Sequence, residues 1–541
     1  MLTSIRHWLD RNILELGREM RLSFLPPLMV YVAAGVSGLT GIVGTFFVKE
    51  HLGLSAAFLA ALGFWAGIPW ALKMPIGHLV DLIWRRKAAL VWLGAALIAA
   101  SLLIMYGLVA EPLRMGRVMS LEAWFVLSAL LSPVGYVIQD VVADAMTVEA
   151  VPRVDEHGQA LPAETRRLMN TTLQTLGRVA IIGGGVLVSM VNVLMFHGVE
   201  ALPQAAKVAV YAQVYGMALL IPLVSVAGVL LAALLRRREE RRLRARGFAE
   251  AQLRELLEPP LLPLKPNWWI LGGSALFVAF SLSVGLAQLE FGQEIIFVGS
   301  FAIISFLMAR LLRELDEESR RTLLGTAIII FVFRAIPGPG AGSTWWMIDV
   351  LGFDQSFLAR LSLLASVLTL LGLFLFRRFM GERPIAHIVA FLTLAGTLLS
   401  LPTLGMYYGL HEWTAAHTGG IVDARFIALI DTALESPLGQ IAMVPMLAWI
   451  ANSAPAGLKA TYFAVMASFT NLALSAAQLG TKYLNQLYHV SREVRDPASN
   501  AVKVAADYGQ LGSLFLTAIA LGLVLPFAAI WLTRLCRLRS A

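Results

Sequence analysis

Long apolar stretches alternate with short polar turns along almost the whole chain. A stretch of about 20 apolar residues is long enough to cross a bilayer as an α-helix. The alternating ten-residue segments of a membrane barrel are absent. We therefore predict an all-α polytopic membrane protein with about fourteen transmembrane helices. The predicted spans lie at residues 24–48, 54–78, 88–108, 121–149, 169–196, 208–235, 268–288, 293–313, 322–345, 356–376, 385–410, 423–451, 461–487 and 510–533.

Composition agrees with this class and adds an orientation. Only 14% of the 541 residues are charged and 58% are hydrophobic, whereas soluble proteins carry about 25% charged residues. Most Lys and Arg fall in turns on one predicted side, which is typical of a cytoplasmic face. An even number of spans then places both termini in the cytoplasm, and we expect the inner (plasma) membrane of a bacterium. The net charge of +8 indicates contact with anionic lipid and not with nucleic acid.

Several kinds of chemistry find no support in the sequence. The single cysteine, Cys536, excludes an intramolecular disulfide, and no Cys/His cluster suggests a metal site. No nucleophile–base motif indicates an enzyme, and nothing points to a cofactor. Residues 1–22 carry apolar positions at helical spacing with arginines between them, and they lack a signal-peptide cleavage site. We expect them to form an amphipathic helix on the cytoplasmic surface.

The chain repeats itself across its two halves. The matching segments are residues 52–62 with 351–361, and Ser132-Pro-Val-Gly135 with Ser436-Pro-Leu-Gly439. Both matches open or continue equivalent spans, and Ser55 and Asp354 are the predicted N-caps. The repeat indicates two parallel six-helix bundles with two helices inserted between them. Parallel halves related about the membrane normal are a transporter architecture, in which the site lies between the halves near the midplane.

The repeat and the charge pattern together divide the chain into six parts. They are an amphipathic N-terminal helix (1–22), an N-terminal six-helix bundle (23–235), a basic cytoplasmic linker (236–267), two inserted transmembrane helices (268–320), a C-terminal six-helix bundle (321–535) and a cytoplasmic tail (536–541). We interpret the linker as a solvated, lipid-touching segment, with a partner-docking or regulatory helix as the alternative.

A short polar loop follows the second span. A Gly lets helix ends pack closely, and an Asp can bond to a neighbouring helix end. The loop resembles the signature of the major facilitator superfamily, from which it departs at Leu82 and Trp84, where Arg and Gly are usual. The alternative is a basic turn that only anchors the chain to the membrane. The predicted gating loop comprises Lys73, Gly77, Asp81, Arg85 and Arg86.

Further segments make the resemblance more specific. The chain is similar to the folate–biopterin transporter family of the major facilitator superfamily at residues 73–87, Gln139-Asp140-Val-Val-Ala-Asp144-Ala145, 351–360, 435–445 and 460–471. These segments cover both bundles but not residues 1–22, residues 236–320 or the C-terminal tail, and the inserted pair departs from the usual twelve-helix plan. The resemblance implies a proton-coupled secondary transporter for folates, pterins or similar anions.

The first bundle carries acidic residues inside a predicted span. Asp140 and Asp144 are four residues apart and share one helical face. Arg178 in the next span lies at a similar depth, so we predict a charge pair between Asp140 and Arg178. The pair either only holds two helices together, or lets the carboxylate exchange a proton or recognise substrate. Lys73 either snorkels to the inner interface or pairs with Asp81 or Asp144.

The second bundle offers a counterpart. Asp431 and Glu435 also lie four residues apart, and Arg334 lies at an overlapping depth. Pro337-Gly-Pro339-Gly340 cannot continue a regular helix, and discontinuous helices beside midplane charges are typical of transporter sites. We predict that Arg334 approaches Asp431 or Glu435 and that this cluster handles substrate or protons. The alternative is a kinked helix with a structural ion pair.

A polar stripe follows one face of the eleventh helix, counted without the inserted pair. Its members are Asn471, Ser475, Gln478 and Lys482. Such residues either hold helices together or line a water-filled path, and we weigh these readings equally. Gln440, in one of the family-like segments, completes the predicted substrate or proton pathway.

These observations predict a secondary active transporter that moves a folate/pterin-like or other small organic anion, together with protons, by alternating access. Arg can clamp a carboxylate with two hydrogen bonds, and a pterin edge offers paired donors to a carboxylate such as Glu435. Trp65, Tyr136, Trp345 and Trp346 either stack on a flat ring or anchor the interface. The alternative function is an assembly or docking factor for another membrane protein or pigment. No feature indicates an oligomeric state.

Overall fold

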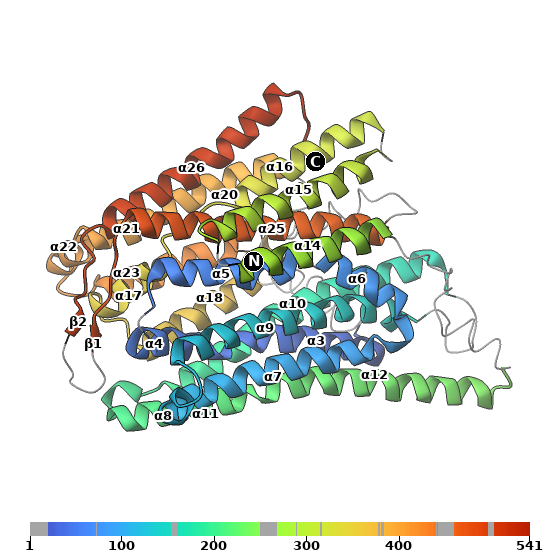
Figure 1. Ribbon diagram of the computed structural model, residues 1–541, viewed down its shortest axis with the longest axis horizontal. Helices are drawn as coiled ribbons and strands as arrows, with labels where there is room; N and C mark the ends of the chain where they lie inside the picture. The colour runs from blue at the N-terminus through green and yellow to red at the C-terminus, as the bar shows by residue number, and fades with distance from the viewer. Residues whose placement is uncertain are drawn as a thin grey trace, which may run out of the picture.

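Long helices run back and forth along one axis of the molecule in this computed structural model (Figure 1). The structure describes residues 20–52, 54–71, 73–152, 161–248, 268–287, 289–313, 316–376, 379, 383–439, 441, 459–495 and 502–540. The predicted all-α class is confirmed, and one short hairpin interrupts it: β1 (Val494–Arg495) pairs antiparallel with β2 (Val502–Val504). The predicted N-terminal amphipathic helix lies mostly outside the described residues.

The N-terminal bundle is built from the helices before residue 250. They are η2 (Leu22–Phe24), α3 (Leu25–Val36), η3 (Ser37–Thr40), α4 (Gly41–His51), α5 (Ala56–Ala71), α6 (Lys73–Leu82), η4 (Trp84–Arg86), α7 (Ala88–Ala110), α8 (Pro112–Gly116), α9 (Leu121–Ala150), α10 (Ala163–Met195), η5 (Val199–Ala201), α11 (Gln204–Ala218) and α12 (Leu220–Ala245). Helix α12 continues past residue 236, so the start of the predicted linker is helical, and the pair of Arg236 with Glu240 lies on that extension.

The remaining helices form the inserted pair and the C-terminal bundle. The inserted pair is α14 (Trp268–Leu286) and α15 (Gly292–Leu312). The C-terminal bundle contains α16 (Glu317–Arg334), α17 (Ala341–Asp349), α18 (Gln355–Leu375), α20 (Ile385–Leu399), α21 (Leu401–Tyr407), α22 (Leu410–His417), α23 (Ala424–Glu435), η6 (Ser436–Leu438), α25 (Lys459–Leu487) and α26 (Leu511–Leu535).

Ten helices among the described residues are long and apolar enough to cross a membrane. They include every predicted span of the N-terminal bundle and one inserted helix, α15. The other four predicted spans contain α14, α16 with α17, α23, and α25, which are shorter, more polar or only partly described. The count of fourteen therefore stays a prediction.

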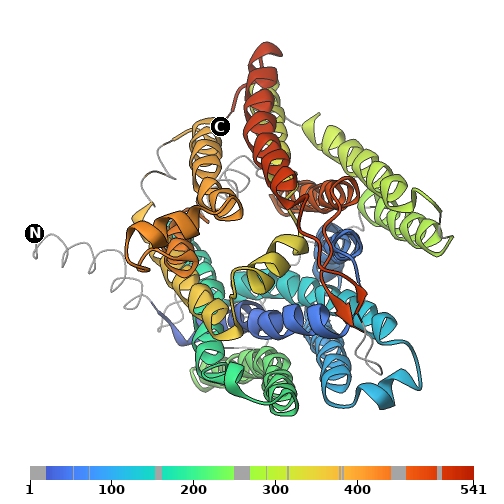
Figure 2. The same ribbon diagram turned by 90° about the vertical axis from the view of Figure 1, so that its left-hand side faces the viewer.

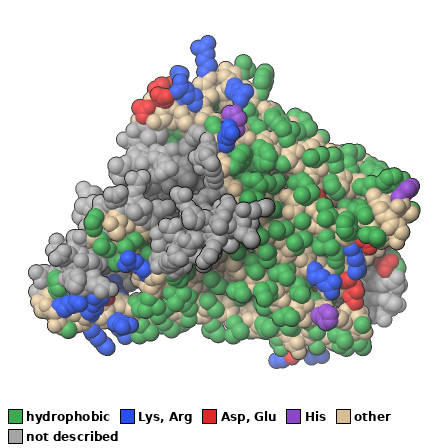
Figure 3. Space-filling view, turned by 180° about the vertical axis from the view of Figure 1, so that it is seen from behind, with side chains coloured by type: hydrophobic (Ala, Val, Ile, Leu, Met, Phe, Trp, Pro, Cys, Tyr) green, Lys and Arg blue, Asp and Glu red, His purple; other side chains and the backbone are tan. Residues whose placement is uncertain are grey.

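The helix ends define two faces of the molecule. We call the end with the β1–β2 hairpin, α8 and α22 the hairpin face, and the end where α12 finishes the linker face (Figure 1). Hydrophobic side chains cover much of the surface between these ends, and charged side chains gather toward the ends (Figure 3). This distribution is what a bilayer around the middle of the molecule requires.

Both copies of the repeated segment begin a helix with a side chain that caps its N-terminus. Ser55 accepts a hydrogen bond from the Phe58 backbone N–H at 3.1 Å, just before α5. Asp354 accepts one from the Phe357 N–H at 2.6 Å, just before α18. Both predicted N-caps are confirmed, and each satisfies a backbone donor that would otherwise lack a partner inside the membrane.

Close helix contacts depend on a few glycines. A Cβ atom at Gly94 of α7 would lie 2.7 Å from the carbonyl oxygen of Gly135 in α9, and the reverse also holds. A Cβ at Gly35 of α3 would lie 2.1 Å from the carbonyl oxygen of Ile181 in α10. Small residues that let backbones approach are the usual basis of helix association in membranes.

The inserted pair packs against both bundles on one side. Figure 2, a view along the helices, shows α14 and α15 outside the bundles and beside α25. Ile296 of α15 shares a buried apolar cluster with Phe64 of α5 and Leu479 of α25. Ile304 belongs to a second cluster with Phe469 of α25. The pair therefore covers the line where α5 of the first bundle meets α25 of the second.

Candidate functional site

A charged cluster joins three helices of the first bundle. Lys73, the first residue of α6, places its Nζ 2.6 Å from Asp140 Oδ2 and 2.8 Å from Asp144 Oδ2 on α9. Tyr31 of α3 donates its hydroxyl to Asp144 Oδ1 at 2.7 Å. The side chains of Lys73 and Asp140 are each 17% exposed. Because the two Asp residues share a helical face, one cation serves both carboxylates, of which Asp144 is 40% exposed.

This cluster corrects the predicted partner of Asp140. Arg178 on α10 interacts electrostatically with Asp140, but it forms no ion pair with any residue that the structure describes. Lys73 forms that pair instead, because α6 packs directly against α9. Equal depth along two helices does not fix which side of each helix faces the other. Of the two readings of Lys73, pairing with Asp144 is confirmed.

The loop between α6 and α7 makes its described ion pair through a residue outside the predicted set. Lys87 is 7% exposed, and its Nζ lies 2.6 Å from Glu149 Oε1 near the end of α9. The same ammonium sits 4.1 Å from the centre of the Trp84 ring. Trp84 thus stands where the superfamily usually has Gly and stacks on the cation. The signal that the sequence offered was a Lys three residues after a Trp.

The predicted members of this loop are less engaged. A Cβ at Gly77 would meet Val141 only at an ordinary 3.9 Å, so close packing does not require glycine there. Arg86 is exposed. The side chains of Asp81 and Arg85 lie outside the described part of the structure, so their predicted gating role stays a prediction.

The acidic pair of the second bundle has a different environment. Asp431 and Glu435 lie on the last turns of α23 and interact electrostatically with each other. Thr403 of α21 donates a long hydrogen bond of 3.4 Å to Asp431 Oδ2. Among the described residues, neither carboxylate forms an ion pair. This pair therefore differs from Asp140 and Asp144 in having no described cationic partner.

The predicted helix break in the second bundle is confirmed. Helix α16 ends at Arg334, and α17 begins only at Ala341. Gly340 has a φ of +76°, and a Cβ there would lie 2.8 Å from Asn485 Nδ2. Two side chains of α25 hold the break: Gly338 N–H donates to Thr481 Oγ1 at 3.0 Å, and Asn485 Nδ2 donates to the Pro339 carbonyl at 3.1 Å. Thr481 and Asn485 are not members of the polar stripe predicted on α25, because they lie to one side of it around the helix.

The predicted approach of Arg334 to the second acidic pair is wrong for this conformation. The described structure contains no ion pair between Arg334 and Asp431 or Glu435. Helix α16 packs on α20, α25 and α26, and α23 packs on α18, α21 and the shared neighbour α20, with no α16–α23 contact among the stronger helix pairs. The depth argument gave the height of each residue in the membrane but not its position around the bundle.

The polar stripe of α25 faces other helices. Asn471 Nδ2 donates to the Trp70 carbonyl of α5 at 3.2 Å. Gly63 and Gly67 of α5 leave room for Gln478 and Ser475, whose side-chain oxygens would lie 2.8 and 2.9 Å from a Cβ at those glycines. This geometry matches helix-holding contacts across the two bundles. Gln440 lies outside the described residues.

Lys482 at the end of the stripe has a partner on the inserted pair. Its Nζ lies 2.9 Å from Glu294 Oε1 of α15, with side chains 16% and 21% exposed. Tyr483 also donates its hydroxyl to Glu294, and Gln293 Nε2 donates to the Ala61 carbonyl of α5 at 3.3 Å. Two adjacent residues of α15 therefore bind one helix from each bundle. The sequence analysis did not select Glu294, because this residue lies near the end of a predicted span, where an acidic side chain can reach water and needs no partner.

Polar contacts cross between the bundles near the hairpin face. Lys49 Nζ at the end of α4 lies 2.5 Å from Asp349 Oδ1 at the end of α17. Tyr508 donates its hydroxyl to Asp349 Oδ2 at 2.5 Å. Burial and the Asp349 carboxylate raise the pKa of Tyr508 above its ordinary value, so the phenol keeps the proton that it donates.

The second seam between the bundles runs along α10 and α18. Ser189 Oγ of α10 lies 2.9 Å from Ser362 Oγ of α18. At the hairpin-face end, beside this seam, Gln355 Nε2 donates to the Tyr211 hydroxyl of α11 at 2.7 Å. Uncharged hydroxyl and amide contacts of this kind can be broken and remade at modest cost. The two bundles are thus joined along two antiparallel helix pairs, α5 with α25 and α10 with α18.

Other predicted elements have structural places. Trp345 and Trp346 are 2% and 3% exposed, and Trp346 packs on Tyr407 and Phe515 in the apolar core. These rings are therefore not available to stack on a ligand in this conformation. The described residues contain no group of three or more His, Cys, Asp or Glu side chains that could hold a metal ion.

The sequence was compared with protein families and with known proteins. The model of the BT1 family matches residues 34–539. The "Folate-biopterin transporter" of Synechocystis sp. is 24% identical over 475 residues, which cover 87% of this chain and 76% of that protein.

Solved structures share the fold. A POT family transporter in complex with 5-aminolevulinic acid has a TM-score of 0.59 at 14% identity, with 96% of each chain covered. The nucleoside transporter NupG has a TM-score of 0.52 at 12% identity, covering 94% of this chain and 99% of that chain. The inward open xylose transporter XylE from E. coli has a TM-score of 0.51 at 12% identity, with 94% of each chain covered. The predicted major facilitator-like fold is confirmed.

Proposed function

The chain belongs to the BT1 family and is an integral membrane transporter; from this premise we propose that it carries a folate/pterin-like or other small organic anion together with protons. The proposed mechanism is alternating access, in which two bundles rock about a site between them. The relative named for folate and biopterin supports the substrate class. The residues below support the coupling to protons.

The pair of carboxylates on α23 carries the proposal of proton coupling. Asp431 and Glu435 have no cationic partner among the described residues. A carboxylate inside a membrane protein needs a counter-charge, a proton or a donor from a ligand. A proton or the amino-pyrimidine edge of a pterin would supply what the described residues do not. We therefore assign these two residues to proton or substrate binding.

The cluster on α9 has a second role in this proposal. Lys73 holds both Asp140 and Asp144, and Arg178 interacts electrostatically with Asp140. A second cation close to the first lets a carboxylate change partners when the helices shift. Asp140 is therefore a second candidate for the coupling residue, with Lys73 and Arg178 as alternating counter-charges.

The remaining proposed pathway residues bind or guide the anion. Arg334, at the end of α16 beside the helix break, suits a two-point hydrogen bond with a substrate carboxylate. Asn471, Gln440 and Lys482 complete the proposed path. Lys482 would have to exchange Glu294 for the anion.

Alternating access must break the contacts that cross the hairpin face. The ion pair of Lys49 with Asp349 and the hydrogen bond of Gln355 with Tyr211 join opposite bundles. Opening this face separates those partners, whereas the seams of α5 with α25 and of α10 with α18 can serve as pivots. We place the hairpin face outside and the linker face in the cytoplasm of a bacterial inner membrane, in accord with the basic extension of α12.

The alternative function, a docking or assembly factor, gains no specific support. Helix α15 uses Gln293, Glu294 and a row of apolar residues to bind α5 and α25. Its outer side chains, such as Val298 and Phe306, are exposed, and lipid tails are their expected neighbours. Glu294 of the inserted pair forms an ion pair with Lys482 of α25. This contact supports a role for the inserted pair inside the transporter itself.

Uptake of labelled folate into proteoliposomes tests the function. Full-length protein should accumulate folate against its gradient only when an inward proton gradient is present. Folate that equilibrates equally with and without the pH gradient would overturn the coupling, and transport of other anions but not folate would overturn the substrate class.

Two variants locate the coupling residue. Asp140→Asn or Glu435→Gln should abolish gradient-driven accumulation yet leave exchange of labelled for unlabelled substrate intact, because exchange needs no net proton movement. Arg114→Gln, which changes an exposed ion pair at the start of α8, serves as the matched control. If both carboxylate variants keep full accumulation, these residues are structural and the assignment is wrong.

A further inference from the structure

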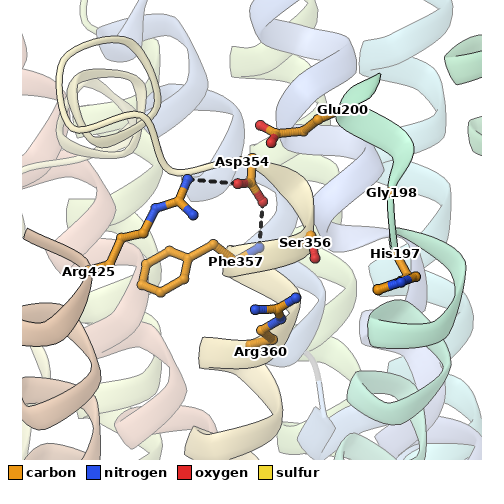
Figure 4. A pocket seen from close by; sticks show the side chains of 8 residues that line it. All are labelled: His197, Gly198, Glu200, Asp354, Ser356, Phe357, Arg360 and Arg425. Carbon is orange, nitrogen blue, oxygen red and sulfur yellow. Dashed lines mark hydrogen bonds and ion pairs between the residues drawn. The ribbon is translucent and has the colours of Figure 1, made fainter. Parts of the chain in front are cut away.

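A cavity opens near the hairpin face where the two bundles meet (Figure 4). Its volume is about 210 Å³. The first bundle contributes the segment after α10, and the second bundle contributes the first turns of α18 and α23. The lining residues are His197, Gly198, Glu200, Asp354, Ser356, Phe357, Arg360 and Arg425.

One side of the cavity holds an ion pair. Arg425 Nη2 lies 2.8 Å from Asp354 Oδ2 and donates to the Gly352 carbonyl at 2.9 Å. The other carboxylate oxygen of Asp354 caps α18 by accepting from the Phe357 N–H at 2.6 Å. Arg425 and Asp354 therefore hold the starts of α23 and α18 together, and Glu200 interacts electrostatically with both.

The other side of the cavity carries Arg360, and Glu200 is the remaining charged residue of the lining. Arg360 lies in the membrane-spanning helix α18, and it forms no ion pair with any residue that the structure describes. Figure 4 shows its guanidinium on the side of the cavity that also holds Ser356 and His197. A charged side chain in a membrane-spanning helix has a partner or faces a ligand site as a rule. An Arg, a hydroxyl and an imidazole are the groups that bind oxyanions.

We propose that this cavity binds a small oxyanion, either a carboxylate or a phosphate group, through Arg360 and Ser356 of one bundle and His197 of the other. The size supports a small group, since sites for drug-sized ligands occupy about 300–1,000 Å³. The oxyanion is therefore a free small anion or the headgroup phosphate of a lipid. This site is separate from the charged residues that we assign to the transport pathway.

The position between the bundles gives the site an effect on transport. An anion held by residues of both bundles binds only the conformation in which they meet on this face. By linkage it stabilises that conformation. Oxyanion binding should therefore keep the hairpin face closed.

Thermal unfolding of the purified full-length protein in a detergent without phosphate tests the binding. Sodium phosphate and sodium acetate should each raise the unfolding temperature saturably at constant ionic strength. Arg360→Gln should weaken the apparent affinity roughly tenfold or more, since it removes the charge and the two-point hydrogen bond. Arg114→Gln, on the same face and 82% exposed, should leave the response unchanged.

A second variant keeps the test informative if Arg360→Gln fails to fold. Glu200→Gln removes a negative charge from the cavity and should tighten the binding of phosphate. Added phosphatidylglycerol separates the two sources: a rise that needs this lipid and Arg360 identifies a headgroup, whereas a rise with phosphate alone identifies a free anion. An equal response in Arg360→Gln, a response that follows only ionic strength, or weaker binding in Glu200→Gln would overturn the proposal.

Closure of the hairpin face has its own measurement. In a Cys536→Ser background, cysteines replacing Lys49 and Asp349 stand at the crossing pair. A bifunctional maleimide should link them faster with phosphate present, and Arg360→Gln should remove the increase. A link that forms at the same rate with and without phosphate would contradict the coupling to conformation.

Discussion

The two bundles carry the same acidic spacing and treat it in opposite ways. On α9, Asp140 and Asp144 share Lys73 as a partner. On α23, Asp431 and Glu435 have no ion pair among the described residues. The first pair has a cation within 2.8 Å of both carboxylates, and the second pair has none among the described residues. The two pairs are not equivalent positions of the repeat, because Asp140 and Asp144 follow the Ser-Pro-x-Gly segment whereas Asp431 and Glu435 precede it. The neighbouring helices decide whether each pair has a cationic partner.

The repeated Ser-Pro-x-Gly segment shows the same divergence. In the first bundle Pro133 lies inside the continuous helix α9, and Gly135 touches Gly94 of α7. In the second bundle Pro437 lies in the 3-10 turn η6 that follows α23. The same four-residue pattern therefore continues a helix in the first bundle and follows the end of one in the second.

Removal of Lys73 should have the largest effect on stability. It tests whether the first acidic pair depends on its cation. Lys73→Met leaves two partly buried carboxylates without a cation, which costs about 3–5 kcal/mol of stability. The double variant with Asp140→Asn should recover part of that loss. Thermal unfolding in detergent measures both. Equal unfolding temperatures for the wild type and Lys73→Met would mean that the first pair does not depend on its cation either.

The link between the inserted pair and α25 should come next. Glu294→Gln removes the counter-charge of Lys482 but keeps a hydrogen-bond acceptor. Since hydrogen bonds to charged groups contribute about 1.5–3 kcal/mol, we expect a loss within that range. Glu318→Gln, whose pair with Arg539 is exposed, is the matched control with little expected change. Identical unfolding temperatures for the two variants would show that the inserted pair is held by apolar packing alone.

The repeated glycine offers a matched pair of substitutions. A Cβ at Gly135 would lie 2.7 Å from the Gly94 oxygen, whereas one at Gly439 would come no closer than 3.4 Å to Ser436. Overpacking costs about 1–3 kcal/mol, and Ala regains about 1 kcal/mol of helix propensity. Gly135→Ala should therefore lower the unfolding temperature and Gly439→Ala should not. The reverse order would show that the two segments do not pack as the structure describes.

Removal of one charge from each acidic pair should change the unfolding temperature in opposite directions, and the change at Asp431 should be the smallest of all. Asp431→Asn removes repulsion between like charges four residues apart, which destabilises a helix by about 0.2–0.5 kcal/mol. This variant should unfold at the same temperature as the wild type or slightly higher. Asp140→Asn should unfold lower, because it strips a partner from Lys73. A clear loss of stability in Asp431→Asn would reveal a partner for Asp431 and end the contrast.

The sequence by itself determined the fold class and several local features. Hydrophobic spans follow from the length of a membrane crossing. The N-caps Ser55 and Asp354 and the break after Arg334 follow from local chemistry within a few residues. These features depend on neighbours in the chain, which the sequence displays directly.

Only the tertiary structure decided which charges meet. The sequence gives the depth of Asp140, Arg178 and Arg334 in the membrane, and depth allowed the wrong partners. Whether two residues touch depends on the rotation of each helix and on its neighbours, and these are set by packing of whole apolar faces. Lys73 with Asp140, Glu294 with Lys482, and Lys49 with Asp349 join residues far apart in the chain for this reason.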